Sequence, residues 1–534
     1  MPAPHYRAPL HCMKFALAAL GGLPRTLAHS QFDAINEELV DAVLEEASKF
    51  SHQVLSPLNV KGDRHPAKKQ EDGSVVTPPG FRAAYQMFVE NGWNAAGITL
   101  ERGGQGMPAV VSTLMNEMWH GANMAFGLCP MLTQSAIELL TTHGTVEQHL
   151  TYLAKLVSGE WTGTMCMTEP QAGSDVGAIT TRATPEGEHF RIRGSKIYIT
   201  FGEHDLSENI VHVVLARMDG APAGVKGLSL FIVPKFLVEE GGKLTSMRND
   251  ITCVSLEEKM GLHGSPTCVL SFGVGTGAVG YLLGQPNEGI KAMFTMMNAA
   301  RFAVGLQGVG VLSYALQMAE GYVQERIQGR TPSGHPAKIM EHPDVQRMLL
   351  TLQGHDLALR LFAIYFAQQQ DVIRIAKDDT ERKRAAERVE LLTPIFKAHA
   401  THMAFTHCST AMQIYGGLGY IEDTGIAQLL RDIRVAMIYE GTNGIQALDL
   451  VGRKLMQQEG TLVKDLLTEI WNTGISLQQS PNPVLKRLCG PLLDAAKHLE
   501  VATIWAMQKN QDATEKSRQS LYLMAEDYLQ LLGY

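Results

Sequence analysis

A single glutamate between two predicted helices could act as a general base. Glu440 lies in the segment RDIRVAMIYEGTNGIQALDLVGRKL, residues 431–455, where one helix is predicted to end near Tyr439 and the next to begin at IQALDL. Glycines 441 and 444 bracket the short loop, and the surrounding residues are mainly apolar. Desolvation raises the pKa of a carboxylate, which makes it a better proton acceptor near neutral pH. A solvent-facing glutamate at a helix end is the alternative interpretation.

A second segment, MCMTEPQAGSDVG at 165–177, is predicted to contact a polar ligand. A strand end opens there into a loop that carries hydroxyl and carboxylate side chains, and Gly173 allows a ligand to approach the backbone. Such loops offer N–H groups and hydroxyls to polar or anionic groups. A well-capped turn without a ligand explains these residues equally well.

Other patterns are better explained by structure than by chemistry. GTGAVG at 275–280 matches GxGxxG, but the following YLLGQPNEG cannot continue as the helix that a dinucleotide site requires, so a turn is expected. His399, His402 and His407 beside Cys408 lack HExxH or a second nearby cysteine, so structural histidines and no metal site are expected. Neither a P-loop nor a GxSxG motif is present.

The periodicity of the apolar residues changes twice along the chain. It is helical over 31–160, alternates with period two from Trp161 to about Leu283, and is helical again from Gly289 to Met456 and beyond Gly460. The β region has no intervening helices, which favours antiparallel strands. We therefore predict an α+β fold with an N-terminal extension (1–34), a helical domain (35–160), a middle antiparallel β domain (161–284), a C-terminal helical bundle (285–458) and an additional helical domain (459–534).

Composition indicates a globular protein that buries a large core. Of the 534 residues, 45% are hydrophobic and 19% charged, and the net charge of −8 counts against a polyphosphate partner such as nucleic acid. Seven scattered cysteines without a CxxC pair indicate a reducing compartment. The apolar run at 294–319 is long enough to span a bilayer, but it contains Arg301 and Gln307, so a buried helix is predicted.

Four motifs together resemble those of the acyl-CoA dehydrogenase family, in the same order. They are MCMTEPQAGSDVG at 165, KIYITFG at 196, QIYGGLGY at 413 and IYEGTNGIQ at 438, and the resemblance covers about residues 35–455. The N-terminal start, SPLN (56–59), TPPGF (77–81) and the C-terminal helices look more like the bacterial 3-methylmercaptopropionyl-CoA dehydrogenase subfamily. Members of that subfamily usually extend beyond LLGY, so the additional helical domain is expected to be shortened here.

The resemblance implies FAD as the cofactor and assigns roles to individual residues. Glu440 matches the catalytic base, which removes the proton α to the thioester as the β hydride passes to flavin N5. In the family, the base's own backbone N–H and a flavin hydroxyl bind the thioester oxygen. The implied cofactor contacts are Met165, Met167, Thr168, Gly173, Ser174, Tyr198, Thr200, Arg326, Gln413, Gly416, Gly417, Thr442 and Asn443, and the implied substrate contacts are Ser174, Arg301, Gly441 and Arg453.

The sequence departs from the family pattern at several of these positions. Tyr198 stands where tryptophan is usual, and RIQG at 326–329 lacks the phenylalanine and one residue of the family's RxxFG. Gly444 replaces a common glutamine, and Asn298 a common aspartate three residues before Arg301. These changes make a transfer of substrate preference unsafe.

The function predicted is FAD-dependent α,β-dehydrogenation of an acyl-CoA thioester, either 3-methylmercaptopropionyl-CoA or another short or medium acyl-CoA, in a bacterial cytoplasm. The resemblance implies an electron-transferring flavoprotein or similar acceptor and a homodimer or homotetramer with FAD near the subunit interface, without nucleic acid or a membrane span. An acyl-CoA oxidase that uses O2 is one alternative. A nucleic-acid-binding flavoprotein of the alkylation-response type is another, although the acidic net charge and the glutamate of YEGT count against it.

Overall fold

An N-terminal group of helices precedes the β region. The computed structural model describes residues 4–239, 241–512 and 514–534. Helix α3 shows why these segments fold locally: Asn36 accepts a hydrogen bond from the N–H of Leu39 (2.8 Å), and Val40, Leu44 and Ala47 form its buried stripe. The helices are α1 (Leu10–Leu20), α2 (Leu23–Leu27), α3 (Glu37–Phe50), α4 (Ser56–Arg64), α5 (Phe81–Glu90), α6 (Ala109–Ala122), α7 (Met124–His143), α8 (Val146–Gln148) and α9 (Ala154–Ser158), with a small hairpin of β1 (Lys68–Lys69) and β2 (Val75–Val76).

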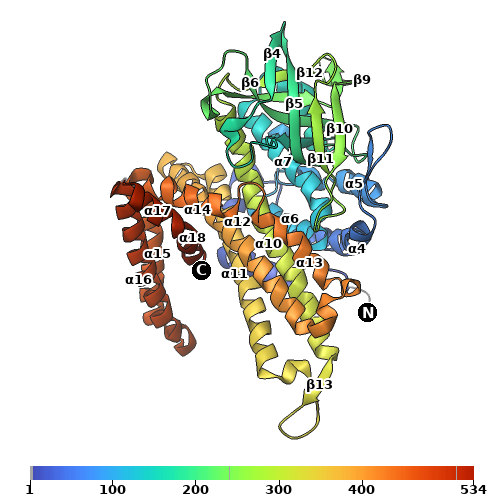
Figure 1. The fold of residues 1–534 in the computed structure, drawn as a ribbon. Helices are drawn as coiled ribbons and strands as arrows, with labels where there is room; N and C mark the ends of the chain where they lie inside the picture. Colours follow the sequence, from blue (N-terminus) through green and yellow to red (C-terminus); the bar gives the residue numbers. More distant parts are fainter. Residues whose placement is uncertain (1–3, 240, 513) are drawn as a thin grey trace.

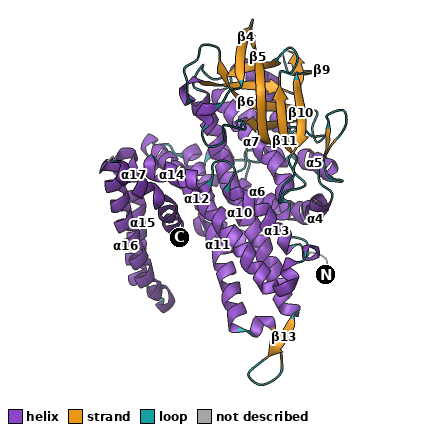
Figure 2. Cartoon of the chain, in the orientation of Figure 1, coloured by secondary structure: helices purple, strands orange, loops and turns teal. Residues whose placement is uncertain are grey.

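The middle region is an eight-stranded sheet (Figures 1 and 2). Its strand order is β10-β11-β5-β12-β7-β6-β3, with β4 beside β5 and β6. The strands are β3 (Trp161–Cys166), β4 (Arg182–Glu186), β5 (His189–Thr200), β6 (Asn209–Met218), β7 (Leu228–Pro234), β10 (Ile251–Leu256), β11 (Thr267–Phe272) and β12 (Ala278–Leu283), and β8 (Phe236–Glu239) pairs with β9 (Lys243–Arg248) in a separate hairpin.

Most of these strands pair antiparallel, as predicted, but two pairings differ. Strands β3 and β4 both run parallel to β6. The physical reason is the loop at 167–181, which returns the chain to the same end of the sheet, so that β4 starts in the direction of β3 instead of turning back in a tight hairpin. This loop is the segment that the sequence singled out as a ligand contact.

Long helices form the C-terminal bundle. They are α10 (Gly289–Glu325), α11 (Pro343–Ile375) and α12 (Asp379–Tyr415). The shorter helices α13 (Ile426–Ile433) and α14 (Asn443–Gly452) follow. The hairpin of β13 (Ile327–Arg330) and β14 (Pro336–Lys338) projects from the end of α10 that lies farthest from the sheet (Figure 1). Helices α10 and α12 approach closely at Gly308, where a Cβ atom would lie 2.7 Å from the carbonyl oxygen of Ala400.

Helix α10 is a core helix of this bundle. Among the described residues it alone is long and apolar enough to span a membrane, and 89% of its most apolar stretch is buried inside the protein. It contacts α6 and α7 of the N-terminal group as well as α11 and α12. The buried helix predicted around residues 294–319 is therefore present.

In the part of the chain that the structure describes, four further α-helices follow the bundle. They are α15 (Thr461–Gln478), α16 (Pro483–Asp512), α17 (Glu515–Leu523) and α18 (Ala525–Gly533). Helices α15 and α16 lie alongside each other beside the bundle, and α18 packs against α12 and α14 (Figure 1).

A buried ion cluster joins the N-terminal helices to the bundle. Arg360 of α11 is fully buried and contacts Glu117 of α6 (2.6 Å) and Asp356 (2.7 Å). Burying such a cluster costs desolvation free energy, but removing one member costs more, because it leaves an uncompensated charge in the core.

Candidate active site

The loop that carries Glu440 has an unusual backbone conformation. Glu440 and Gly441 have positive φ values of 55° and 88°, and Thr442 ends the loop as the N-cap of α14, accepting a hydrogen bond from the N–H of Ile445 (3.1 Å). Glycine is favoured at 441 by its positive φ, which residues with a Cβ atom rarely adopt. A left-handed glutamate costs of order 1 kcal/mol or more, and such strain concentrates at functional sites.

The carboxylate of Glu440 faces the protein interior. Its Oε2 atom is buried and has no hydrogen-bond partner among the described residues. Burial raises its pKa to about 7, although Arg301 and Lys397 nearby favour the charged form. A carboxylate with this proton affinity is suited to accept a proton near neutral pH.

Two cations hold consecutive carbonyl groups of the loop. Nε of Arg301, on α10, donates to the carbonyl oxygen of Glu440 (3.1 Å), and Nζ of Lys397, on α12, donates to that of Gly441 (2.8 Å). Arg301, expected from the sequence to contact substrate, is only 6% exposed and is engaged with the base loop. The N–H of Glu440 has no acceptor within the described part of the chain.

Buried Glu169 organises the loop at 167–181. Its carboxylate accepts hydrogen bonds from the N–H and hydroxyl groups of Thr180 and Thr181, from Gln171, and from Nζ of Lys196 (2.8 Å). Burial opposes its ionisation, but Lys196 and the hydroxyl and amide donors outweigh this and lower its pKa to about 2. Glu169 is one of the carboxylates that the sequence places in this loop, but no role was predicted for it. Its signal was an acid in a loop that is otherwise rich in hydroxyls.

Strand β5 carries this loop and presents Tyr198. Nζ of Lys196 also donates to the carbonyl oxygen of Met167 (2.9 Å), and the N–H of Ile197 donates to that of Thr168 (2.9 Å). The register between β5 and β11 shifts here, because Ile197 and Tyr198 together oppose one residue of β11. This β-bulge, with Tyr198 at φ 59°, turns the aromatic side chain outward, and it is 60% exposed.

The predicted cofactor contacts around the loop and β5 therefore lie together. Thr168, Met165, Met167 and Thr200 are partly buried, whereas Ser174 and Gly173 are exposed. A Cβ atom added at Gly173 would meet no other atom within 4 Å, so the described residues leave the loop open there. An exposed aromatic face beside open backbone and hydroxyl groups fits a flavin ring system.

A second group of predicted contacts lies at the far end of the bundle. Gln413, Gly416 and Gly417 are exposed where α12 ends, and Tyr322 stacks on Tyr415 with ring centroids 4.2 Å apart, which brings that end close to the end of α10 and to Arg326. The helix between Lys397 and Gln413 is about 24 Å long. Within one chain, these residues therefore lie far from the base loop.

The side chains of two other predicted contacts have partners within the fold. The amide of Asn443 donates to the carbonyl oxygen of Ala398 (3.1 Å) and accepts from Nζ of Lys397 (3.0 Å). Arg453 is paired with Asp449 (2.8 Å) and Glu390 (3.2 Å). The side chain of Asn443 is thus hydrogen-bonded within the fold, and its predicted contact with the cofactor stays a prediction.

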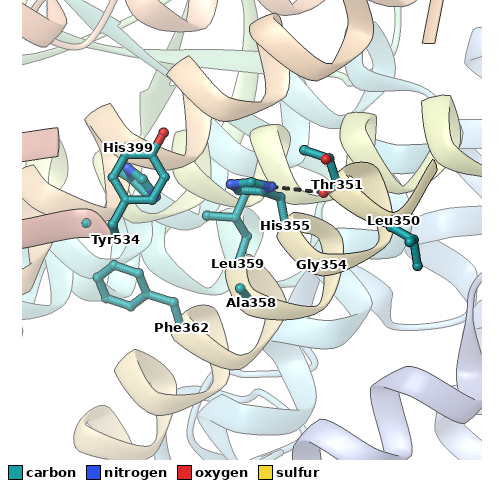
Figure 3. Close-up of a pocket in the computed structure, with 10 residues that line it drawn as sticks. Leu350, Thr351, Gly354, His355, Ala358, Leu359, Phe362, His399 and Tyr534 are labelled. Atoms are coloured by element: carbon teal, nitrogen blue, oxygen red, sulfur yellow. Dashed lines mark hydrogen bonds between the residues drawn. The ribbon is translucent and has the colours of Figure 1, made fainter. Parts of the chain in front are cut away.

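A pocket of about 550 Å³ lies on another side of the bundle (Figure 3). His355 and Leu359 of α11, His399 of α12 and Tyr534 line it, and Nδ1 of His399 is bonded to Oε1 of Gln530 (2.8 Å). Positions 397 and 399 are about 200° apart around a helix, so this pocket faces away from the base loop. Within the described ranges no three His, Cys, Asp or Glu side chains are placed to hold a metal ion.

The fold and the domain order define the class of the protein. Residues 40–160, 164–273 and 287–456 match the N-terminal, middle and C-terminal domains of acyl-CoA dehydrogenase, respectively. The chain belongs to the acyl-CoA dehydrogenase family, a family of flavin-dependent oxidoreductases.

Individual relatives extend this match over most of the chain. It is 44% identical over 459 residues to 3-methylmercaptopropionyl-CoA dehydrogenase of Ruegeria pomeroyi, covering 85% of this chain and 77% of the relative. It is 33% identical over 485 residues to a butyryl-CoA dehydrogenase of Syntrophomonas wolfei, covering 88% and 79%. The fold resembles that of Caenorhabditis elegans ACDH-11 with a TM-score of 0.80 at 20% identity, over 99% of this chain and 88% of that one.

Proposed function

We propose that the protein is an FAD-dependent acyl-CoA dehydrogenase in which Glu440 removes the α-proton of the thioester. The observation that carries this proposal is the buried Oε2 of Glu440, which has no partner among the described residues, on a strained loop held by Arg301 and Lys397. A thioester α-proton is a far weaker acid than a carboxylic acid, so a raised pKa of the base does not suffice.

The developing enolate needs hydrogen-bond donors. The N–H of Glu440 is available for this role, since no described residue accepts from it, and one preorganised donor contributes about 3 kcal/mol to the transition state. Thr168, Ser174 and Thr200, with Tyr198 as the aromatic face, would hold the flavin. The flavin, when bound, supplies the acceptor for the hydride, while the protein supplies alignment and exclusion of water.

The match to the R. pomeroyi relative supports 3-methylmercaptopropionyl-CoA or another short or medium acyl-CoA as the substrate. We further propose an electron-transferring flavoprotein as the acceptor. A homodimer or homotetramer would bring Arg326, Gln413, Gly416 and Gly417 of one copy to the flavin of another, because these residues lie far from the base loop of their own chain.

The test is anaerobic bleaching of the flavin by a panel of straight-chain, branched, aryl and 3-methylmercaptopropionyl thioesters. The purified protein should show a flavin spectrum that at least one thioester bleaches. Glu440→Gln should keep FAD and lose bleaching, whereas Glu500→Gln, on the exposed side of α16, should behave as the wild type. Peroxide release in air would indicate an oxidase instead.

The activity should also depend on pH in a defined direction. Because burial raises the pKa of Glu440 to about 7 and the base must be ionised, kcat/KM should rise as the pH increases through about 7. If no thioester bleaches the flavin, or if Glu440→Gln turns over normally, the proposal is wrong.

A further inference from the structure

Lys397 is a buried lysine whose ammonium contacts only neutral acceptors in the described structure. Its side chain is fully buried in the middle of α12, and Nζ donates to the carbonyl oxygen of Gly441 (2.8 Å) and to Oδ1 of Asn443 (3.0 Å). Two other buried lysines differ, because Lys196 pairs with Glu169 and Lys454 with Glu390. Burying an ammonium group without a directly bonded carboxylate is costly.

The charged group that most favours the protonated form of Lys397 is the carboxylate of Glu440. Burial lowers the pKa of Lys397 to about 7, while Glu440 favours its charged form and Arg301 opposes it. The effect is reciprocal, since Lys397 favours the ionised form of Glu440. Removing this charge should therefore raise the proton affinity of Glu440 and leave less of it ionised at neutral pH.

The same lysine fixes the backbone next to the base. Its bond to Gly441 holds the peptide unit that follows the left-handed Gly441, while Arg301 holds the unit before it from α10. Asn443, at the start of α14, closes the arrangement: its amide accepts a hydrogen bond from Nζ of Lys397 and donates one to the carbonyl oxygen of Ala398 on α12. The direction in which Glu440 points thus depends on α12.

We propose that Lys397 is a positioning residue for Glu440: its ammonium orients the base loop through the Gly441 carbonyl and places a positive charge beside the base. The inference rests on the proposed function, in which Glu440 is the base. Lys397 itself touches neither substrate nor flavin in this scheme.

The experiment separates charge from shape with three variants. Lys397→Met removes the charge and the donor, Lys397→Gln keeps a donor without the charge, and Lys397→Arg keeps the charge. Lys454→Met is the matched control, since it also truncates a buried lysine, but one that is paired with Glu390. Flavin content and the pH dependence of kcat/KM are measured for each variant.

For Lys397→Met and Lys397→Gln, the acid limb of the pH profile should move upward by about one pH unit with FAD retained. The limbs of Lys397→Arg and Lys454→Met should stay at the wild-type position. If Lys397→Met does not fold, Lys397→Gln decides. A uniform loss of activity at every pH with an unmoved limb would show a merely structural role and overturn the proposal.

A second readout does not depend on turnover. Infrared difference spectra of the carboxyl band, with Glu440→Gln subtracted, report the titration of Glu440 directly in wild type and Lys397→Gln. An upward move in the variant supports the inference even if no thioester bleaches the wild-type flavin, an outcome that would refute only the proposed function. An unchanged titration midpoint refutes the role of Lys397 alone.

Discussion

Replacing Glu169 by glutamine should loosen the loop at 167–181 without unfolding the protein. The magnitude follows from the pKa of Glu169, which is lowered from its ordinary value of 4.5 to about 2. Each pKa unit corresponds to about 1.4 kcal/mol, so the interactions of the ionised carboxylate stabilise the folded form by about 3 kcal/mol. This stabilisation is present above pH 4.5 and is lost as the pH falls to about 2, because the folded-state pKa is the lower one.

The assay is hydrogen exchange of the Thr180 and Thr181 amides, which donate directly to the carboxylate. At pH 7, Glu169→Gln should accelerate their exchange about 100-fold, which corresponds to about 3 kcal/mol. Glu186→Gln is the control in the same domain, because Glu186 is half-exposed and pairs with Arg191 at the surface, where solvent screens the pair.

A further variant tests the cause. Glu169→Gln leaves the ammonium of Lys196 buried without its carboxylate, so Glu169→Gln/Lys196→Met should recover part of the protection. FAD should bind more weakly to Glu169→Gln than to the wild type, since the loop carries the proposed flavin contacts. Protection within threefold of wild type at both threonines would refute the reasoning.

Two other perturbations follow from the structure. Arg360→Met should lower the free energy of unfolding by about 3–5 kcal/mol, because Glu117 and Asp356 would remain buried without their cation. The control Arg347→Met should change it by less than about 1 kcal/mol, because Arg347 and Asp344 form an exposed pair. Urea denaturation measures both variants, and equal losses would contradict this account. Tyr198→Ala should weaken FAD binding about tenfold in a fluorescence titration, a loss of about 1.4 kcal/mol, while the apoprotein keeps its Tm because the ring is 60% exposed. The control is Tyr522→Ala, at 51% exposure on α17. Unchanged FAD affinity in Tyr198→Ala would show that the ring does not contact the flavin.

The sequence predicted the succession of helices, strands and helices because the apolar period changes sharply at Trp161 and at Gly289. It did not predict that β3 and β4 run parallel to β6, since strand direction depends on where the loop at 167–181 returns the chain, and no local pattern records that. Short apolar strands look alike in parallel and antiparallel sheets when both faces are buried, as in β6.

For the site, the glycines and the helix start around Glu440 made it a candidate base, and the resemblance to the acyl-CoA dehydrogenase family gave it that predicted role. The resemblance implies that Arg301 lies near the substrate, and that stays a prediction; the sequence did not predict its hydrogen bond to the carbonyl oxygen of Glu440, 139 positions away. Lys397 lies in the apolar stretch TPIFKAHA. A lone cation among the buried positions of a helix is the pattern that could have indicated a role for it. Contacts between residues so distant in sequence have no local pattern.

The left-handed conformation of Glu440 has a consequence for how this chain tolerates change. At φ 55° the backbone strain is smaller for glycine or asparagine than for glutamate, and neither residue would carry a buried charge there. A screen that selects for thermal stability alone would therefore favour variants that lose the proposed base. Replacing Glu440 would relieve backbone strain and stabilise the fold, but it would remove the proposed base. Stability and activity therefore favour different residues at this position.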